Sequence, residues 1–184
     1  MQKKPPLATL TVHLQDEADT IALAREFAPM LDGSLPAIGA AHRGGRIHLR
    51  GELGAGKTAF VRALLQAAGV TGRIKSPTYT LLETYKVFNL YFYHLDFYRF
   101  GEPREWLDAG FRDILQKEAV VLIEWPERAG EYLPSPDLEI RLEYADIGRQ
   151  ASLTAYSNKG KLWLTALTFP STGSLQTERP DDGS

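Results

Sequence analysis

The chain has 184 residues and a formal net charge of -2, a length that fits one domain. Its 21 Lys and Arg do not outnumber its 23 Asp and Glu, so the charge does not favour direct binding of nucleic acid. The absence of cysteine excludes disulfides and thiolate chemistry. The sequence shows neither a secretory signal nor an apolar stretch that could span a membrane. We therefore expect a cytoplasmic protein.

The first part of the chain predicts a strand, a helix, a loop and a second strand. Partial alternation from Leu7 to Leu14 indicates the strand, and Asp16 is a typical N-cap for the helix that follows. Four glycines and a proline mark 32–45 as a loop. Arg46 to Arg50 is the second strand, and its polar composition suggests that one face of the sheet is less covered than usual.

The middle of the chain predicts helices and strands in alternation. An apolar helical face after the second strand ends at Gly69 in the manner of a C-cap. Thr80 to Phe100 predicts two strands with a turn near Asn89. Pro103 begins a further helix, which is interrupted at Gly110.

The last part predicts a buried strand and a hairpin. The apolar run from Val120 to Ile123 is typical of a strand buried on both faces. Leu138 to Tyr144 alternates and turns back into Ala151 to Tyr156, which predicts an antiparallel hairpin with one exposed face. Lys161 to Leu167 fits either a helix or a strand.

Together these elements predict an α/β fold. We expect the three layers of a P-loop NTPase, with a largely parallel central sheet and a C-terminal antiparallel hairpin. One domain would cover residues 1–168, and 169–184 would form a disordered tail.

One motif carries most of the chemical information. Gly51 to Thr58 reads G-E-L-G-A-G-K-T, which matches a phosphate-binding loop, G-x-x-x-x-G-K-[ST]. The glycines let backbone amides point at a phosphate, and the following helix adds its positive end. Lys57 would reach the β and γ phosphates, and the Thr58 hydroxyl would ligate Mg²⁺. Because the motif lies between a predicted strand and an amphipathic helix, we expect a nucleotide there.

Two acidic residues end strand-like segments and are candidates for the metal or the attacking water. Asp96 and Glu124 would lie beside the loop, because ligands bind at the carboxyl ends of parallel strands. Buried carboxylates need a cationic partner. The alternatives are an ordinary strand-end acid for Glu124 and a salt bridge to Arg99 for Asp96.

Three further features lie near these acids in the sequence. The hydroxyls of Ser76 to Thr80 predict either a switch that senses the γ-phosphate or a plain turn. Trp125 precedes Pro126, which favours an extended backbone, and its ring would cover the site or a partner protein, or join the core. The histidines lack metal-ligand spacing, although His94 shares a strand face with Asp96.

The motifs together resemble the bacterial TsaE (YjeE) family, the small ATPase of tRNA threonylcarbamoyladenosine biosynthesis. The resemblance rests on the motif loop and on four further segments, in the family's order. These segments are K-S-P-T-Y-T-L-L-E at Lys75 to Glu83, Y-H-L-D-F-Y-R at Tyr93 to Arg99, G-F-R-D at Gly110 to Asp113, and I-E-W-P-E-R at Ile123 to Arg128. The terminal hairpin continues the match, whereas Glu52 stands where the family usually has Asp.

The resemblance implies an ATPase that uses ATP and Mg²⁺. It would work with two partner proteins, TsaB and TsaD, of which TsaD transfers threonylcarbamoyl to adenosine 37 of tRNA. The chain itself would contact tRNA only indirectly. Hydrolysis would reset that complex between turnovers. The catalytic residues implied are Lys57, Thr78, Asp96 and Glu124, and the metal site would include Thr58, Glu124 and Asp96. The nucleotide-binding residues implied are Glu17, Gly51, Glu52, Leu53, Gly54, Ala55, Gly56, Lys57, Thr58, Ala59 and Arg149.

Alternative functions make different demands on the sequence. A small-molecule kinase needs an Arg-rich lid, which no segment shows. A GTPase needs N-K-x-D, but Asn158 to Lys161 ends in lysine. A nucleotide-sensing module with incidental hydrolysis stays open. Arg99 and Arg128 are candidate arginine fingers, but neither is evident, so we expect slow hydrolysis that partner proteins accelerate.

Overall fold

The computed structural model describes residues 5–108, 110–116, 118–171 and 175–177. Its elements surround one eight-stranded sheet of order β3-β4-β5-β2-β6-β7-β1-β8. The strands are β1 (Ala8–Leu14), β2 (Gly45–Arg50), β3 (Leu82–Val87), β4 (Leu90–Asp96), β5 (Val120–Glu124), β6 (Leu138–Tyr144), β7 (Arg149–Ala155) and β8 (Gln176–Thr177). The α-helices are α1 (Glu17–Leu31), α2 (Lys57–Ala67), α3 (Glu105–Asp108) and α4 (Asn158–Ala166). Short 3-10 helices are η1 (Ala40–His42), η2 (Phe111–Gln116) and η3 (Pro126–Tyr132).

The centre of the sheet is parallel and its flanks are antiparallel. Strands β4, β5, β2 and β6 run in the same direction, whereas β3, β7, β1 and β8 each pair antiparallel with a neighbour. The predicted parallel core and the β6–β7 hairpin are therefore confirmed. Because β4, β5 and β2 are parallel neighbours, their carboxyl ends lie at the same edge of the sheet.

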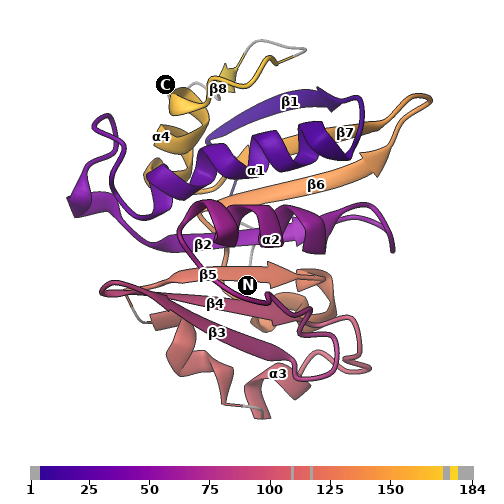
Figure 1. Cartoon of the computed structure of the whole chain (residues 1–184). Helices are drawn as coiled ribbons and strands as arrows, with labels where there is room; N and C mark the ends of the chain where they lie inside the picture. Colours follow the sequence, from indigo (N-terminus) through magenta and orange to yellow (C-terminus); the bar gives the residue numbers. More distant parts are fainter. Residues whose placement is uncertain (1–4, 109, 117, 172–174, 178–184) are drawn as a thin grey trace, which may run out of the picture.

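One face of the sheet packs against the long helices. Figure 1 shows α1 and α2 side by side across this face. Asp16 caps α1 by accepting a hydrogen bond from the Asp19 amide, and Phe27 of α1 packs against Phe60 of α2 with ring centroids 5.9 Å apart. Trp163 of α4 is fully buried in the same apolar cluster. Helical periodicity in the sequence thus produces the first layer of the core.

The opposite face is divided into an apolar and a polar half. Under β4 and β5, a second apolar cluster includes Trp106 of α3 and Ala129 of η3. Under β2 and β6 the outward residues are polar: Arg50 forms ion pairs with Glu127 at 3.0 Å and Glu139 at 2.6 Å. The polar sequence of β2 therefore reflects a sheet face on which charged side chains pair with one another.

Several sequence predictions differ from the structure in detail. The helix expected from Pro103 is reduced to the single turn of α3, followed by η2. The ambiguous segment near residue 161 is the helix α4. Gln176–Thr177 pair with Ala8 and Thr9 of β1, so this part of the expected tail is ordered, while 172–174 and 178–184 lie outside the described residues. None of the helices in the described ranges combines the length and apolar character that a bilayer crossing requires.

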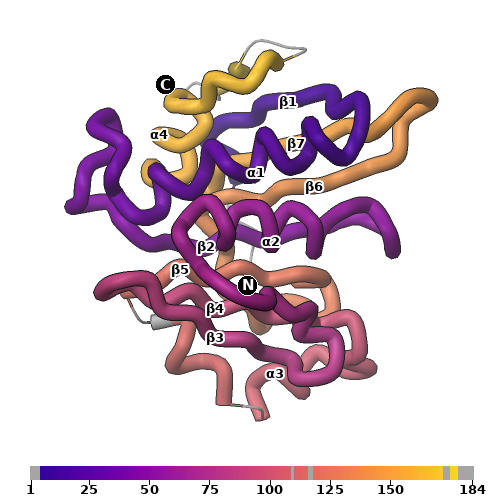
Figure 2. Tube along the Cα trace, in the orientation of Figure 1, coloured from indigo at the N-terminus to yellow at the C-terminus, as the bar shows by residue number. Residues whose placement is uncertain are grey.

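The turn between β6 and β7 lies beside the end of β1, just before α1 begins, as the trace in Figure 2 shows. Gly148 in this turn has φ +73°, and a Cβ there would collide with the Leu14 carbonyl. A glycine is therefore required for the close approach. The contact places Arg149 and Glu17 at the same end of the sheet.

We predict that His48 makes the protein less stable as the pH falls below neutral. Burial, together with Arg46 and Arg50, holds the pKa of His48 well below its usual 6.5. Between pH 7.5 and 5.5 the unfolded chain therefore takes up a proton that the folded chain does not, which lowers the free energy of unfolding by about 1 kcal/mol. Denaturant titrations at both pH values should show that His48→Gln removes this loss, whereas His42→Gln, at an exposed position, retains it. Equal pH dependence in wild type and His48→Gln would contradict the prediction.

Candidate nucleotide-binding site

The motif loop connects the end of β2 to the first turn of α2. Arg50 ends the strand and Lys57 begins the helix, so the loop lies at the carboxyl edge of the parallel strands. Gly51 has φ +139°, and a Cβ there would collide with the Leu142 carbonyl of β6. This glycine lets the loop lie directly against β6 and turn toward the helix.

Lys57 is held inside the loop rather than pointing into solvent. The residue is only 4% exposed, and Nζ donates hydrogen bonds to the carbonyls of Gly51 at 2.6 Å and Glu52 at 2.8 Å. Nζ also lies 3.9 Å from the centroid of the Trp125 ring. Burial lowers the pKa of Lys57 from its usual value, while nearby acids, Glu124 first, oppose the shift. The Lys57 ammonium group therefore lies inside the loop that the motif predicts to bind phosphate.

The two predicted acids are neighbours in the sheet. Asp96 and Glu124 occupy paired positions on the parallel strands β4 and β5, and they are 3% and 2% exposed. His94, also fully buried, contacts Glu124 with 2.8 Å between Nε2 and Oε1. His94 therefore supplies a hydrogen-bond partner for the buried Glu124 side chain.

Each acid contacts one threonine from a different segment. The Thr58 hydroxyl lies 2.9 Å from both carboxylate oxygens of Glu124. The Thr78 hydroxyl donates to Asp96 Oδ2 at 2.7 Å, and the amide of Tyr98 donates to Oδ1 at 2.9 Å. Thr78, in the segment considered as a switch or a turn, is thus in direct contact with a predicted catalytic acid.

A cavity of about 310 Å³ gathers most of the predicted site residues. Its lining residues are Glu17, Thr20, Leu53, Gly54, Gly56, Lys57, Thr58, Ala59, Thr78, Asp96, Tyr98, Glu124, Trp125 and Arg149. Of the predicted set, Gly51, Glu52 and Ala55 do not line it. Glu17 reaches the cavity from α1 and Arg149 reaches it from the β6–β7 hairpin, although most of the chain separates the two residues. The roles of all these residues stay predictions.

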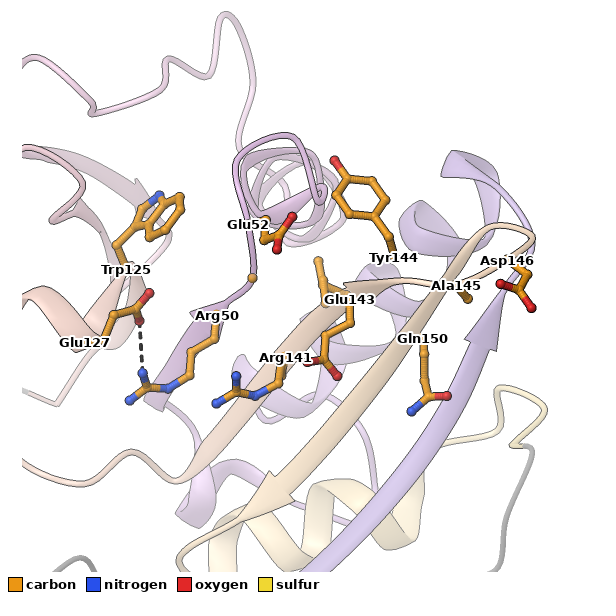
Figure 3. A pocket seen from close by; sticks show the side chains of 12 residues that line it. Arg50, Glu52, Trp125, Glu127, Arg141, Glu143, Tyr144, Ala145, Asp146 and Gln150 are labelled. Atoms are coloured by element: carbon orange, nitrogen blue, oxygen red, sulfur yellow. Dashed lines mark hydrogen bonds and ion pairs between the residues drawn. The ribbon is translucent and has the colours of Figure 1, made fainter.

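A larger cavity of about 880 Å³ lies next to this one. Figure 3 shows Arg50, Glu127 and Trp125 on one side of it and Arg141 and further hairpin residues on the other. Trp125 lines both cavities. Because the smaller cavity holds the motif lysine, both acids and both threonines, we assign the candidate site to it in spite of its size.

The backbone of Trp125 corrects one expectation. The residue adopts the left-handed conformation (φ 57°, ψ 47°) rather than the extended one. Its amide donates to the Leu49 carbonyl at 3.2 Å, and its own carbonyl accepts from the Arg128 amide at 3.1 Å. These bonds hold the ring between Lys57 and Tyr98, so the side chain covers the site.

The arginines also differ from expectation. Arg99 packs 4.1 Å over the Tyr79 ring, so the alternative considered for Asp96, a salt bridge to Arg99, does not describe this arginine. Arg128 lies 6.0 Å from the Tyr98 ring. Within the described ranges, Arg149 is the one arginine that lines the smaller cavity, and its Nη2 donates to the Gly54 carbonyl at 3.4 Å.

Sequence reasoning did not assign Thr20 or Tyr98 to the site. Thr20 lies one helical turn after Glu17 on α1, so helical spacing could have identified it. Tyr98 follows Asp96 by two residues. Its position results from the turn after β4, which leaves no clear signal in the sequence.

The donor atoms of the site fit a magnesium ion. Thr58, Asp96 and Glu124 offer hydroxyl and carboxylate oxygens, which Mg²⁺ prefers. Over the described ranges, no group of three or more His, Cys, Asp or Glu residues could hold a metal by itself. Mg²⁺ sites commonly combine one or two carboxylates with substrate phosphates. Thr58 and Glu124, with Asp96 nearby, are the residues that would hold the ion.

The fold and the site define an α/β protein with a phosphate-loop motif and two buried acids at the carboxyl edge of its parallel strands. Residues 14–151 match the family model "Threonylcarbamoyl adenosine biosynthesis protein TsaE". The chain belongs to the TsaE family.

Individual relatives agree with this assignment. The chain is 35% identical over 162 residues to the tRNA threonylcarbamoyladenosine biosynthesis protein TsaE of Haemophilus influenzae, covering 88% of this chain and 99% of that protein. It is 36% identical over 112 residues to TsaE of Bacillus subtilis, covering 60% and 70%. The fold is similar to the crystal structure of Bacillus YdiB, with a TM-score of 0.66, 24% identity, and 90% and 95% of the two chains covered.

We predict that tripolyphosphate changes the fluorescence of Trp125. A phosphate in the loop would draw Lys57 Nζ away from the ring, which it now contacts at 3.9 Å. Trp106 and Trp163 are 1% and 0% exposed and should contribute little to the change. Titration of Trp125→Phe should therefore give a flat signal, and a change that persists in this variant would contradict the prediction.

Proposed function

We propose that the chain is the ATPase subunit required for threonylcarbamoylation of adenosine 37 in tRNA. It binds ATP and Mg²⁺ in the smaller cavity and hydrolyses ATP by in-line attack of water. The observation that carries the proposal is the convergence of Lys57, Thr58 and two buried acids in this cavity. Membership of the TsaE family supports the pathway.

The contacts favour different tasks for the two acids. Glu124 contacts the Thr58 hydroxyl, so we assign it to the metal side of the site. Asp96 contacts Thr78 instead, and we assign this pair to the attacking water. A bound Mg²⁺ neutralises charge that develops on the phosphates. Lys57 releases the loop carbonyls and donates to the β and γ oxygens, which stabilises the same charge.

The positions of the arginines support activation by partner proteins. The guanidinium groups of Arg99 and Arg128 lie over the rings of Tyr79 and Tyr98. Arg149 donates a hydrogen bond to the Gly54 carbonyl of the motif loop. An arginine finger typically accelerates phosphoryl transfer by ~10³-fold or more. We therefore propose slow hydrolysis by the isolated chain and acceleration in a complex with TsaB and TsaD, through which tRNA is contacted indirectly.

Replacing Lys57 should weaken nucleotide binding without unfolding the protein. Loss of its charged hydrogen bonds should weaken binding of ATP by about 10- to 100-fold in the presence of Mg²⁺. Isothermal titration calorimetry of Lys57→Ala measures this effect, with the exposed Lys86→Ala as the matched control. Equal affinities for ATP in wild type and Lys57→Ala would exclude the loop as the site.

A reconstituted reaction tests the pathway role. Addition of TsaB and TsaD should accelerate ATP hydrolysis by wild type, and repeated rounds of tRNA modification should depend on the chain. Glu124→Ala should still bind ATP in EDTA but fail to support modification. If Glu124→Ala supports modification as wild type does, while Lys57→Ala does not, the chain is a nucleotide sensor rather than an ATPase.

A further inference from the structure

His94 is a fully buried histidine that lines neither cavity. It lies on β4, two residues before Asp96 and on the same face, and its Nε2 is 2.8 Å from Glu124 Oε1. In the part of the chain that the structure describes, its Nδ1 has no hydrogen-bond partner. The contact with Glu124 is thus the polar interaction that fixes its ring.

The hydrogen bond has a defined direction. An ionised carboxylate only accepts hydrogen bonds, so Nε2 carries the hydrogen and donates it to Glu124. The ring orientation is therefore set by the carboxylate, and the carboxylate orientation by the ring.

Glu124 is held from two sides, and only one of them is expected to persist. The Thr58 hydroxyl contacts both of its oxygens at 2.9 Å. In the proposed complex this hydroxyl turns to the metal, which leaves His94 as the donor that fixes the carboxylate. Residues behind a ligand commonly control metal affinity in this way, and their loss typically weakens it by about 10- to 100-fold.

We propose that His94 is a positioning residue that holds Glu124 for the metal and thereby sets the Mg²⁺ dependence of nucleotide binding. The proposal rests on the proposed function of the site. His94 does not touch the nucleotide, so binding of ATP in the absence of Mg²⁺ should not depend on it. A histidine that only fills space would instead affect folding stability and leave the Mg²⁺ dependence unchanged.

The decisive pair of variants places an amide at different distances from the backbone. The amide of His94→Gln reaches the position of Nε2 and can still donate to Glu124, whereas that of His94→Asn reaches only the position of Nδ1. We expect His94→Asn to raise the Mg²⁺ concentration for half-maximal binding of a non-hydrolysable ATP analogue by about 10-fold or more. His94→Gln should stay within about 3-fold of wild type, and both should bind ATP in EDTA as wild type does.

A double-mutant cycle separates positioning from packing. Glu124→Gln should shift the Mg²⁺ dependence by itself, and adding His94→Asn should then have little further effect, because contacting residues are non-additive. His48→Asn, a buried histidine on the opposite sheet face, serves as the control for a general loss of stability. Urea unfolding of each variant confirms that the folded protein is measured.

The outcomes distinguish this proposal from the function on which it rests. If wild type shows no Mg²⁺-dependent binding of the ATP analogue, the proposed function fails and His94 loses its role with it. The positioning role alone is overturned if wild type binds the analogue in a Mg²⁺-dependent way but His94→Asn and His94→Gln show the same Mg²⁺ dependence as each other. It is also overturned if the effects of His94→Asn and Glu124→Gln on the Mg²⁺ dependence are additive.

Discussion

The site depends on one buried cation. Lys57 is almost completely shielded from solvent, and removing an ammonium group from water is costly unless its charge is compensated. Two carbonyls of its own loop and the Trp125 ring supply that compensation, and Glu124 adds a favourable charge. The loop is therefore closed around its lysine. A phosphate would replace these contacts with stronger ones, because its oxygens carry full negative charge.

Sheet topology explains why distant segments meet at this lysine. Strand β2 lies between β5 and β6, so the motif loop leaves the sheet beside the strand that ends in Glu124. The next parallel neighbour, β4, ends in Asp96 at the paired position. The antiparallel hairpin on the other side brings Arg149 to the loop. Acids, lysine and arginine thus reach one cavity because parallel strands end at the same edge.

Much of this arrangement was predictable from the sequence, since its signals are local. The motif from Gly51 to Thr58 identifies its own structural context, and Asp96 and Glu124 each end a recognisable strand. The contact between His94 and Glu124 was not predictable, because it depends on the register between β4 and β5. The left-handed backbone of Trp125 was also unpredictable, because tertiary hydrogen bonds override the usual preference before proline. The ordered Gln176–Thr177 pairing depends on the free edge of β1, which the sequence does not reveal.

The most direct test of this account is a crystal structure with a non-hydrolysable ATP analogue and Mg²⁺. The account predicts that the phosphates lie in the loop from Gly51 to Thr58, with Lys57 Nζ withdrawn from the Trp125 ring. The Thr58 hydroxyl would have left Glu124 to ligate the metal. A nucleotide bound instead in the larger cavity between Arg50 and Arg141, or a loop left empty at saturating analogue, would contradict it.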